Sequence, residues 1–116
     1  MSNEGEFIKA VQRLKSKLTK ENLWLYILRL LQEKPRYGYE IREEIKKRFN
    51  FYPAIVSGYV IIYKMKRDNL VEERLEKDQS KRADRKYYCI TNKGLAALKE
   101  AKIFLEDLMK KVFDLT

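Results

Sequence analysis

The chain has 116 residues, of which 45% are hydrophobic, so we expect one domain with one modest core. Lys and Arg total 26 against 17 Asp and Glu, and the formal net charge of +9 favours a polyanionic partner, nucleic acid first and an anionic membrane surface second. Cys89 is the single cysteine, which excludes a disulfide framework within the chain. Histidine is absent, which removes the commonest general base and the commonest transition-metal ligand. We therefore expect that the protein is not an enzyme and binds no metal or cofactor.

Residues 1–19 are expected to form an N-terminal amphipathic helix. Apolar residues recur there at three- and four-residue steps: Phe7, Ile8, Val11, Leu14 and Leu18. This stripe needs a partner, for which we favour the chain's own domain or a second subunit over a membrane or a phosphate backbone. The start of the chain does not resemble a signal peptide, and no apolar run approaches the roughly 20 residues that span a bilayer. We therefore expect a cytoplasmic protein without membrane contact.

Residues 20–33 predict a second helix, whose wide apolar stripe is typical of a central core helix. Thr19 is its expected N-cap, and Lys34 and Pro35 end it because a residue before proline avoids helical geometry. Trp24 lies on the stripe and is interpreted as a core or dimer contact rather than as a platform for a ligand.

Two shorter amphipathic segments, residues 37–49 and 53–68, follow in tandem and predict a helix-turn-helix. Residues 36–38 form a tight entry to the first helix, and residues 50–53 form the turn before the second. One face of the first helix is expected to enter the core, and it carries Tyr39, Ile41, Ile45 and Phe49.

The second of these helices is the expected DNA reader. The residues at core spacing on it are Ile55, Tyr59, Ile62 and Met65. The residues left wholly or partly exposed are Ser57, Val60, Ile61, Lys64 and Arg67. Such a surface can meet thymine methyl groups and bind phosphates, but no Arg or Asn lies in its first turn for bidentate base reading. Part of the sequence specificity is therefore expected to come from DNA shape.

Two β-prone runs, residues 70–75 and 86–90, predict a hairpin with a polar insert. Asn69 suits the left-handed conformation that ends the preceding helix. Five basic residues cluster at the expected hairpin tip: Lys77, Lys81, Arg82, Arg85 and Lys86. The order of elements predicts a mainly α (α+β) winged helix-turn-helix domain over residues 20–90, with a basic wing suited to the DNA backbone or minor groove.

Three motifs in the chain resemble the PadR family of transcriptional regulators, over about residues 20–115. They are the run Tyr37-Gly38-Tyr39-Glu40-Ile41, the segment from Val56 through Tyr59 to Leu70-Val71, and the run from Arg85 to Gly94. The resemblance implies a winged helix that binds DNA without metal or nucleotide. The chain departs from the family pattern at Asn69, where glycine is usual, and at Gly58, which costs the reading helix about 1 kcal/mol of helix propensity.

Residues 91–116 are expected to form a long C-terminal helix with Thr91 as its N-cap. Its apolar stripe is too long for one domain to cover, so a dimer is favoured over a monomer with a long core helix. The PadR resemblance likewise implies that this helix packs against a partner subunit. The expected dimer-interface residues are Leu98, Phe104, Leu105, Leu108, Met109 and Val112.

These features predict a sequence-specific transcriptional regulator, expected to be a repressor, that binds double-stranded DNA as a homodimer on a pseudo-palindromic operator. The expected DNA contacts are Arg36, Tyr37, Ser57, Tyr59, Lys64, Lys81, Arg82, Arg85 and Lys86. Two alternatives stay open: a sequence-independent architectural DNA-binding protein, and a winged-helix module that binds a protein partner. The resemblance also suggests a small aromatic effector near the dimer interface, although Trp24 and Phe104 serve equally well as interface core.

Overall fold

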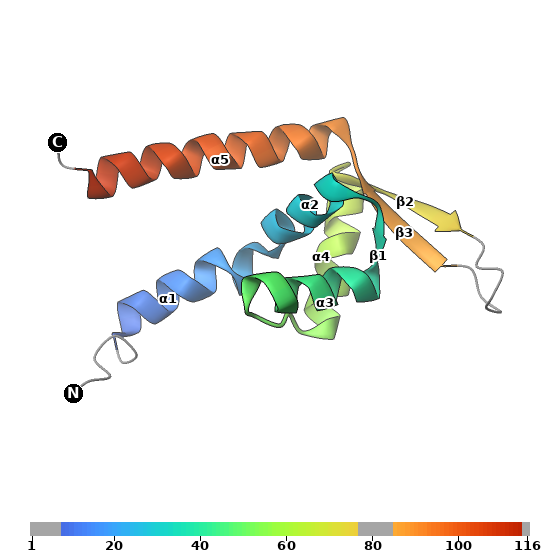
Figure 1. The fold of residues 1–116 in the computed structure, drawn as a ribbon, viewed down its shortest axis with the longest axis horizontal. Coiled ribbons are helices and arrows are strands. Elements are labelled where there is room, and N and C mark those ends of the chain that lie inside the picture. The colour runs from blue at the N-terminus through green and yellow to red at the C-terminus, as the bar shows by residue number, and fades with distance from the viewer. Residues whose placement is uncertain (1–7, 77–84, 115–116) are drawn as a thin grey trace.

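The computed structural model describes residues 8–76 and 85–114. Its elements in chain order are α1 (Lys9–Leu18), the 3₁₀ turn η2 (Lys20–Asn22), α2 (Leu23–Glu33), β1 (Arg36–Tyr37), α3 (Gly38–Phe49), α4 (Ile55–Arg67), β2 (Val71–Glu76), β3 (Arg85–Ile90) and α5 (Asn92–Phe113). In Figure 1, α2, α3 and α4 form a central body with the sheet beside it, while α1 and α5 extend from the body toward the same end. This arrangement confirms the expected mainly α winged helix with an added N-terminal helix and a long C-terminal helix.

The sheet has three antiparallel strands in the order β1-β3-β2. The hairpin of β2 and β3 was expected, whereas β1 was not, because the sequence around Arg36 indicated only a tight entry to the next helix. In the structure Arg36 lies opposite Tyr88 and Tyr37 lies opposite Tyr87. A strand of two residues has almost no local signal, since it exists only through its pairing with β3.

The core is centred on α2, as its wide apolar stripe predicted. The buried residues of this helix are Leu23, Ile27, Leu28, Leu30 and Leu31. Side chains from the other elements complete the core, and they are Ile41, Ile45, Ile62, Met65, Val71 and Tyr88. Burial of this apolar surface is the main term that holds the helix-turn-helix together, at about 25 cal/mol for each Å² removed from water. Cys89 is also buried, as expected for a small apolar residue.

The start of α2 differs from expectation, and the start of α4 lies two residues later than the expected range of residues 53–68. Thr19 does not cap α2, because its hydroxyl donates a hydrogen bond to the carbonyl of Lys15 and a 3₁₀ turn precedes the helix. Pro53 lies in the turn before α4, as expected, and Ala54 is the N-cap of the helix. Both differences concern the first turn of a helix, where backbone groups have several alternative partners.

Two capping predictions are confirmed. Asn69 has φ 63° at the end of α4, in the left-handed region that asparagine tolerates. Thr91 caps α5, because its hydroxyl accepts a hydrogen bond from the amide of Gly94 at 3.0 Å. The same hydroxyl oxygen lies 2.6 Å from the carbonyl oxygen of Asn69, so the end of α4 and the start of α5 are held together.

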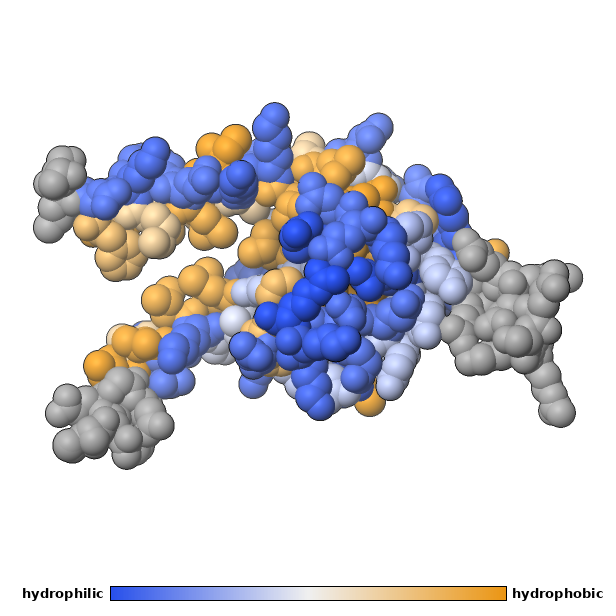
Figure 2. All heavy atoms as spheres, viewed as in Figure 1, coloured by the Kyte–Doolittle hydropathy of each residue, from blue (hydrophilic) through white to orange (hydrophobic). Residues whose placement is uncertain are grey.

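The two projecting helices carry apolar surface that the rest of the chain leaves uncovered. No residue of α1 is buried, so its stripe does not enter the core of its own chain. Figure 2 shows apolar side chains along the sides of α1 and α5 that face each other across an open space. Within residues 8–76 and 85–114, no helix combines the length and apolar character needed to cross a membrane.

Candidate nucleic-acid interface

Helix α4 has one face in the core and one face uncovered. Ile62 and Met65 are buried against the body. The exposed part of α4 is unusually apolar and aromatic, with Val56 73% and Tyr59 61% exposed. The other exposed residues on α4 are Ile55, Ser57, Val60, Tyr63, Lys64 and Arg67. An uncovered helix of 13 residues has the dimensions that enter a DNA major groove.

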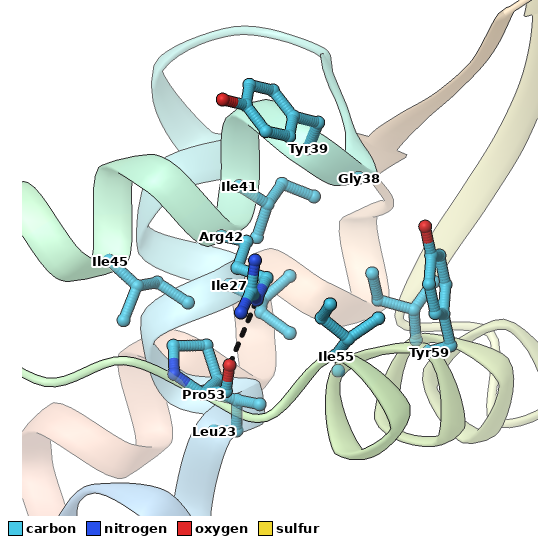
Figure 3. A pocket seen from close by; sticks show the side chains of 12 residues that line it. Leu23, Ile27, Gly38, Tyr39, Ile41, Arg42, Ile45, Pro53, Ile55 and Tyr59 are labelled. Atoms are coloured by element: carbon cyan, nitrogen blue, oxygen red, sulfur yellow. Dashed lines mark hydrogen bonds between the residues drawn. The ribbon is translucent and has the colours of Figure 1, made fainter.

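The entry to α4 is braced by Arg42 of α3. Its Nε donates a hydrogen bond to the Pro53 carbonyl at 3.0 Å (Figure 3). Its Nη1 donates to the Tyr52 hydroxyl at 3.0 Å. The guanidinium carbon also lies 4.0 Å from the centre of the Tyr52 ring. The orientation of α4 is therefore set by the turn as well as by the core. No side chain forms a hydrogen bond that caps the first amides of α4. Free amides at a helix start suit an anion such as phosphate.

The other end of α4 is tied to the wing. Lys66 Nζ lies 2.6 Å from Glu73 Oε1 on β2, in a half-buried pair. This hydrogen bond lowers the pKa of Glu73 and raises the pKa of Lys66, so both groups stay charged at neutral pH. The pair couples α4 to the hairpin that follows it.

The wing lies partly outside the described residues. Lys86 is exposed on β3, in register with Leu75 of β2. Arg85 begins β3 opposite Glu76. The expected contacts Lys81 and Arg82 fall within residues 77–84, outside the described part of the chain.

Arg36 does not lie on the surface. It is 5% exposed, its Nε donates to the Leu30 carbonyl at 3.3 Å, and its Nη2 lies 2.8 Å from Glu33 Oε1. Its expected role as a DNA contact does not fit this placement, because the side chain is buried and its guanidinium satisfies a carbonyl at the end of α2. Tyr37 is half-buried, with its ring 5.6 Å from that of Tyr87 in an edge-to-face contact.

Comparison with known proteins places this architecture in a family. The model of the transcriptional regulator PadR-like family matches residues 27–100, which covers more than half of the chain. The chain belongs to the PadR-like family. PadR-like proteins are DNA-binding transcriptional regulators and not enzymes, so this chain is a regulator of that kind.

Solved PadR-like structures share the fold. A PadR-like regulator from Bacillus cereus is 31% identical with a TM-score of 0.69, over 90% of this chain and 95% of its own. A PadR family regulator from Clostridium difficile is 30% identical with a TM-score of 0.66, over 76% and 94% of the two chains. Bacillus subtilis PadR in complex with operator DNA is 25% identical with a TM-score of 0.62, over 70% of this chain and 45% of that one.

In this PadR-like fold, Tyr39 and Tyr63 are exposed in addition to the expected DNA contact Tyr59. Tyr39 was expected in the core, yet this residue is 64% exposed at the start of α3. Ile55 and Tyr59, also placed at core spacing, are more than half exposed. Tyr63 was overlooked, although its position four residues after Tyr59 puts both rings on adjacent turns. Helical spacing groups residues on one face, but it does not tell which groups the body covers.

In the part of this PadR-like chain that the structure describes, no group of three or more His, Cys, Asp or Glu side chains is arranged to hold a metal ion. The exposed side of α4 carries aromatic rings and the basic residues Lys64 and Arg67.

Proposed function

We propose that the chain is a sequence-specific repressor that binds a pseudo-palindromic operator as a homodimer. The observation that carries the proposal is the uncovered outer face of α4, which is braced at one end by Arg42 and at the other by Lys66 and Glu73. A rigidly held helix is needed for groove recognition because base contacts tolerate little displacement.

In this proposal, Ser57, Tyr59 and Lys64 contact the groove and its walls, with Tyr37 beside the entry. The flanking phosphates are bound by the basic wing, which carries Lys81, Arg82, Arg85 and Lys86. The exposed side chains in the first half of α4 are apolar groups, hydroxyls and rings, which suit thymine methyls and the sugar-phosphate backbone. Shape and deformability of the operator then supply part of the specificity.

The dimer is supported by the surface of α5. Exposed apolar residues continue along it well past the body of the protomer: Phe104, Leu108, Met109 and Val112. Leu105 is half-buried, and Leu98 packs against the protomer's own core, so Leu98 supports the base of the helix more than a dimer seam. A two-fold axis through α5 would set two copies of α4 about one DNA turn apart, roughly 34 Å. The domain boundaries at residues 19 and 90 belong to this proposal.

The operator is first selected from a random pool of DNA. The selected DNA is then titrated with the protein at several salt concentrations, and fluorescence anisotropy measures the affinity. If about six to eight phosphates are neutralised per dimer, log affinity falls with log salt at a slope of about −5 to −7.

Tyr59→Ala should lower the affinity for the selected site more than the affinity for random DNA. Arg29→Ala, which removes an exposed charge from α2, is the matched control and should leave affinity nearly unchanged. A flat salt response would reject the proposal.

The wing is tested separately by replacing Lys81, Arg82 and Arg85 together with alanine. Affinity should fall by a similar factor for all sequences, since phosphate contacts position the protein without reading bases. Unchanged affinity would show that the wing is not a contact.

One observation favours a second candidate, a sequence-independent architectural DNA-binding protein. The exposed first half of α4 carries no Arg or Asn for bidentate base contacts. Competition between the selected site and excess bulk DNA separates the two functions, because a repressor retains its site by a factor of about 10³ or more and an architectural protein does not.

A further inference from the structure

Two of the exposed residues on α4 lie at the side of its exposed surface. Ile55 and Tyr59 line the pocket between α4 and α3, and Figure 3 shows both side chains on the side of α4 that is turned toward the start of α3. A Cβ atom built at Gly38, the first residue of α3, would lie 3.7 Å from Cε1 of Tyr59. The outermost line of α4 is therefore formed by other residues.

Helical spacing identifies the outermost line of α4. Ile62 and Met65 mark the buried side of the helix. At about 100° per residue, the side opposite to them carries Val56, Val60 and Tyr63. These three residues are 73%, 44% and 63% exposed. The N-terminal part of a helix in the major groove contacts the base edges, so Val56 and Val60 are placed nearest to the bases.

A valine side chain can offer a base only apolar contact. It neither donates nor accepts a hydrogen bond, so a polar base edge that it covers loses water without a replacement. Among the four bases, only thymine carries a methyl group in the major groove. Val56 and Val60 are one helical turn apart, about 6 Å along the axis, which spans about two base-pair steps of roughly 3.4 Å. Together they favour thymine at two nearby positions of one half-site.

We propose that Val56 and Val60 determine sequence specificity by contacting the methyl groups of two thymines in each half-site. The inference rests on the proposed function, because it requires that α4 enters the major groove. It adds direct reading of bases to the contribution of DNA shape. The absence of Arg and Asn from the exposed first half of α4 then indicates a different kind of base contact and not a lack of specificity.

The methyl contacts are tested by replacing each thymine of one half-site of the selected operator, in turn, with deoxyuridine, which lacks only the methyl group. At the two positions read by the valines, affinity should fall about three- to fivefold, as expected for the loss of one buried methyl group. Uracil at the other positions should leave the affinity nearly unchanged. An operator in which no replacement weakens binding would overturn the proposal.

Two single variants assign the contacts to residues. Val56→Ala and Val60→Ala shorten exposed side chains without adding a polar group, so both should fold, which circular dichroism checks. Each variant should lose the difference between thymine and uracil at one position, and the double variant should lose it at both. Tyr59→Ala is the matched control on the same helix, because it should lower the affinity for the thymine and uracil operators by the same factor. Methyl dependence that survives in the double variant, or disappears in Tyr59→Ala, would overturn the assignment.

These measurements separate a failure of the valine contacts from a failure of the proposed function. A selected site that is bound tightly without methyl dependence overturns the valine contacts and leaves the proposed repressor intact. If selection enriches no site, the proposed repressor fails, and binding to poly(dA-dT) is compared with binding to poly(dA-dU). Tighter binding of poly(dA-dT) that is lost in the double variant supports the valine contacts, whereas equal binding overturns them.

Discussion

Arg36 links the ends of α2 and α3 through a small charged network. Its guanidinium contacts the Leu30 carbonyl and Glu33, and Glu33 Oε2 lies 2.6 Å from Nη1 of Arg48 at the end of α3. The shared carboxylate compensates the buried positive charge, which would otherwise be costly. Arg36 is positively charged, as many DNA contacts are, but its side chain stabilises the fold.

Arg36→Ala is expected to lower the free energy of unfolding by about 1–3 kcal/mol, because it removes charged hydrogen bonds from a buried position. Urea unfolding measures the loss. Once folded, the variant should bind DNA nearly as well as the unmodified chain. A variant of normal stability with much weaker DNA binding would restore Arg36 as a contact.

Glu33 predicts a stability change in acid. The hydrogen bond from Arg48 is the largest of several interactions that lower its pKa from 4.5 to about 2. Because the folded-state pKa lies below the unfolded value, the stabilisation is complete above about pH 4.5 and is lost as pH falls toward 2. Thermal unfolding between pH 5 and 2 should show a shallower pH dependence in Glu33→Gln. Identical slopes in the two proteins would contradict this assignment.

At the scale of an element, α5 is attached to the body by its first turn. Gly94 is buried there, and a Cβ at this position would overlap the Leu70 carbonyl oxygen and lie 2.8 Å from Cγ1 of Ile90. The close approach lets Thr91 join the start of α5 to the end of α4. The direction of the long helix is thus set by a backbone contact that only glycine allows.

Gly94→Ala should therefore destabilise the protein by about 1–3 kcal/mol, since backbone atoms must shift to admit the methyl group. Gly58→Ala is the matched control: the same substitution in a helix with open space should stabilise by up to about 1 kcal/mol. Chemical denaturation of both variants provides the comparison. Equal effects at the two glycines would show that the contact at Gly94 is not restrictive.

At the scale of the whole molecule, the protomer is elongated, with principal extents of 55 × 33 × 21 Å. The length comes from α1 and α5, whose apolar sides face one another beyond the body (Figure 2). A single chain in solution would expose the apolar sides of α1 and α5 to water. Association with a second copy would bury this surface. The same two helices leave α4 uncovered, so the proposed dimer and DNA surfaces do not compete.

Phe104→Glu combined with Leu108→Glu should convert the proposed dimer into a folded monomer, because two charges would be buried at the seam. Sedimentation velocity measures the mass, and circular dichroism checks the fold. DNA affinity should fall by at least about tenfold as one of two half-sites is lost. Lys110→Glu, which lies on the other side of α5 from Phe104 and Leu108 by helical spacing, is the control and should remain dimeric. A double variant that still sediments as a dimer would refute the α5 interface.

Local chemistry in the sequence determined the helices, the hairpin and the caps at Asn69 and Thr91, because periodicity, dihedral preference and hydroxyl capping act within a few residues. It also predicted α4 as the reading helix, which stays a prediction. Only the tertiary structure decided that Arg36 is buried, that β1 exists, and that Tyr39 and Tyr59 point outward. Those outcomes depend on which helix face another element covers, and helical spacing alone does not contain that information.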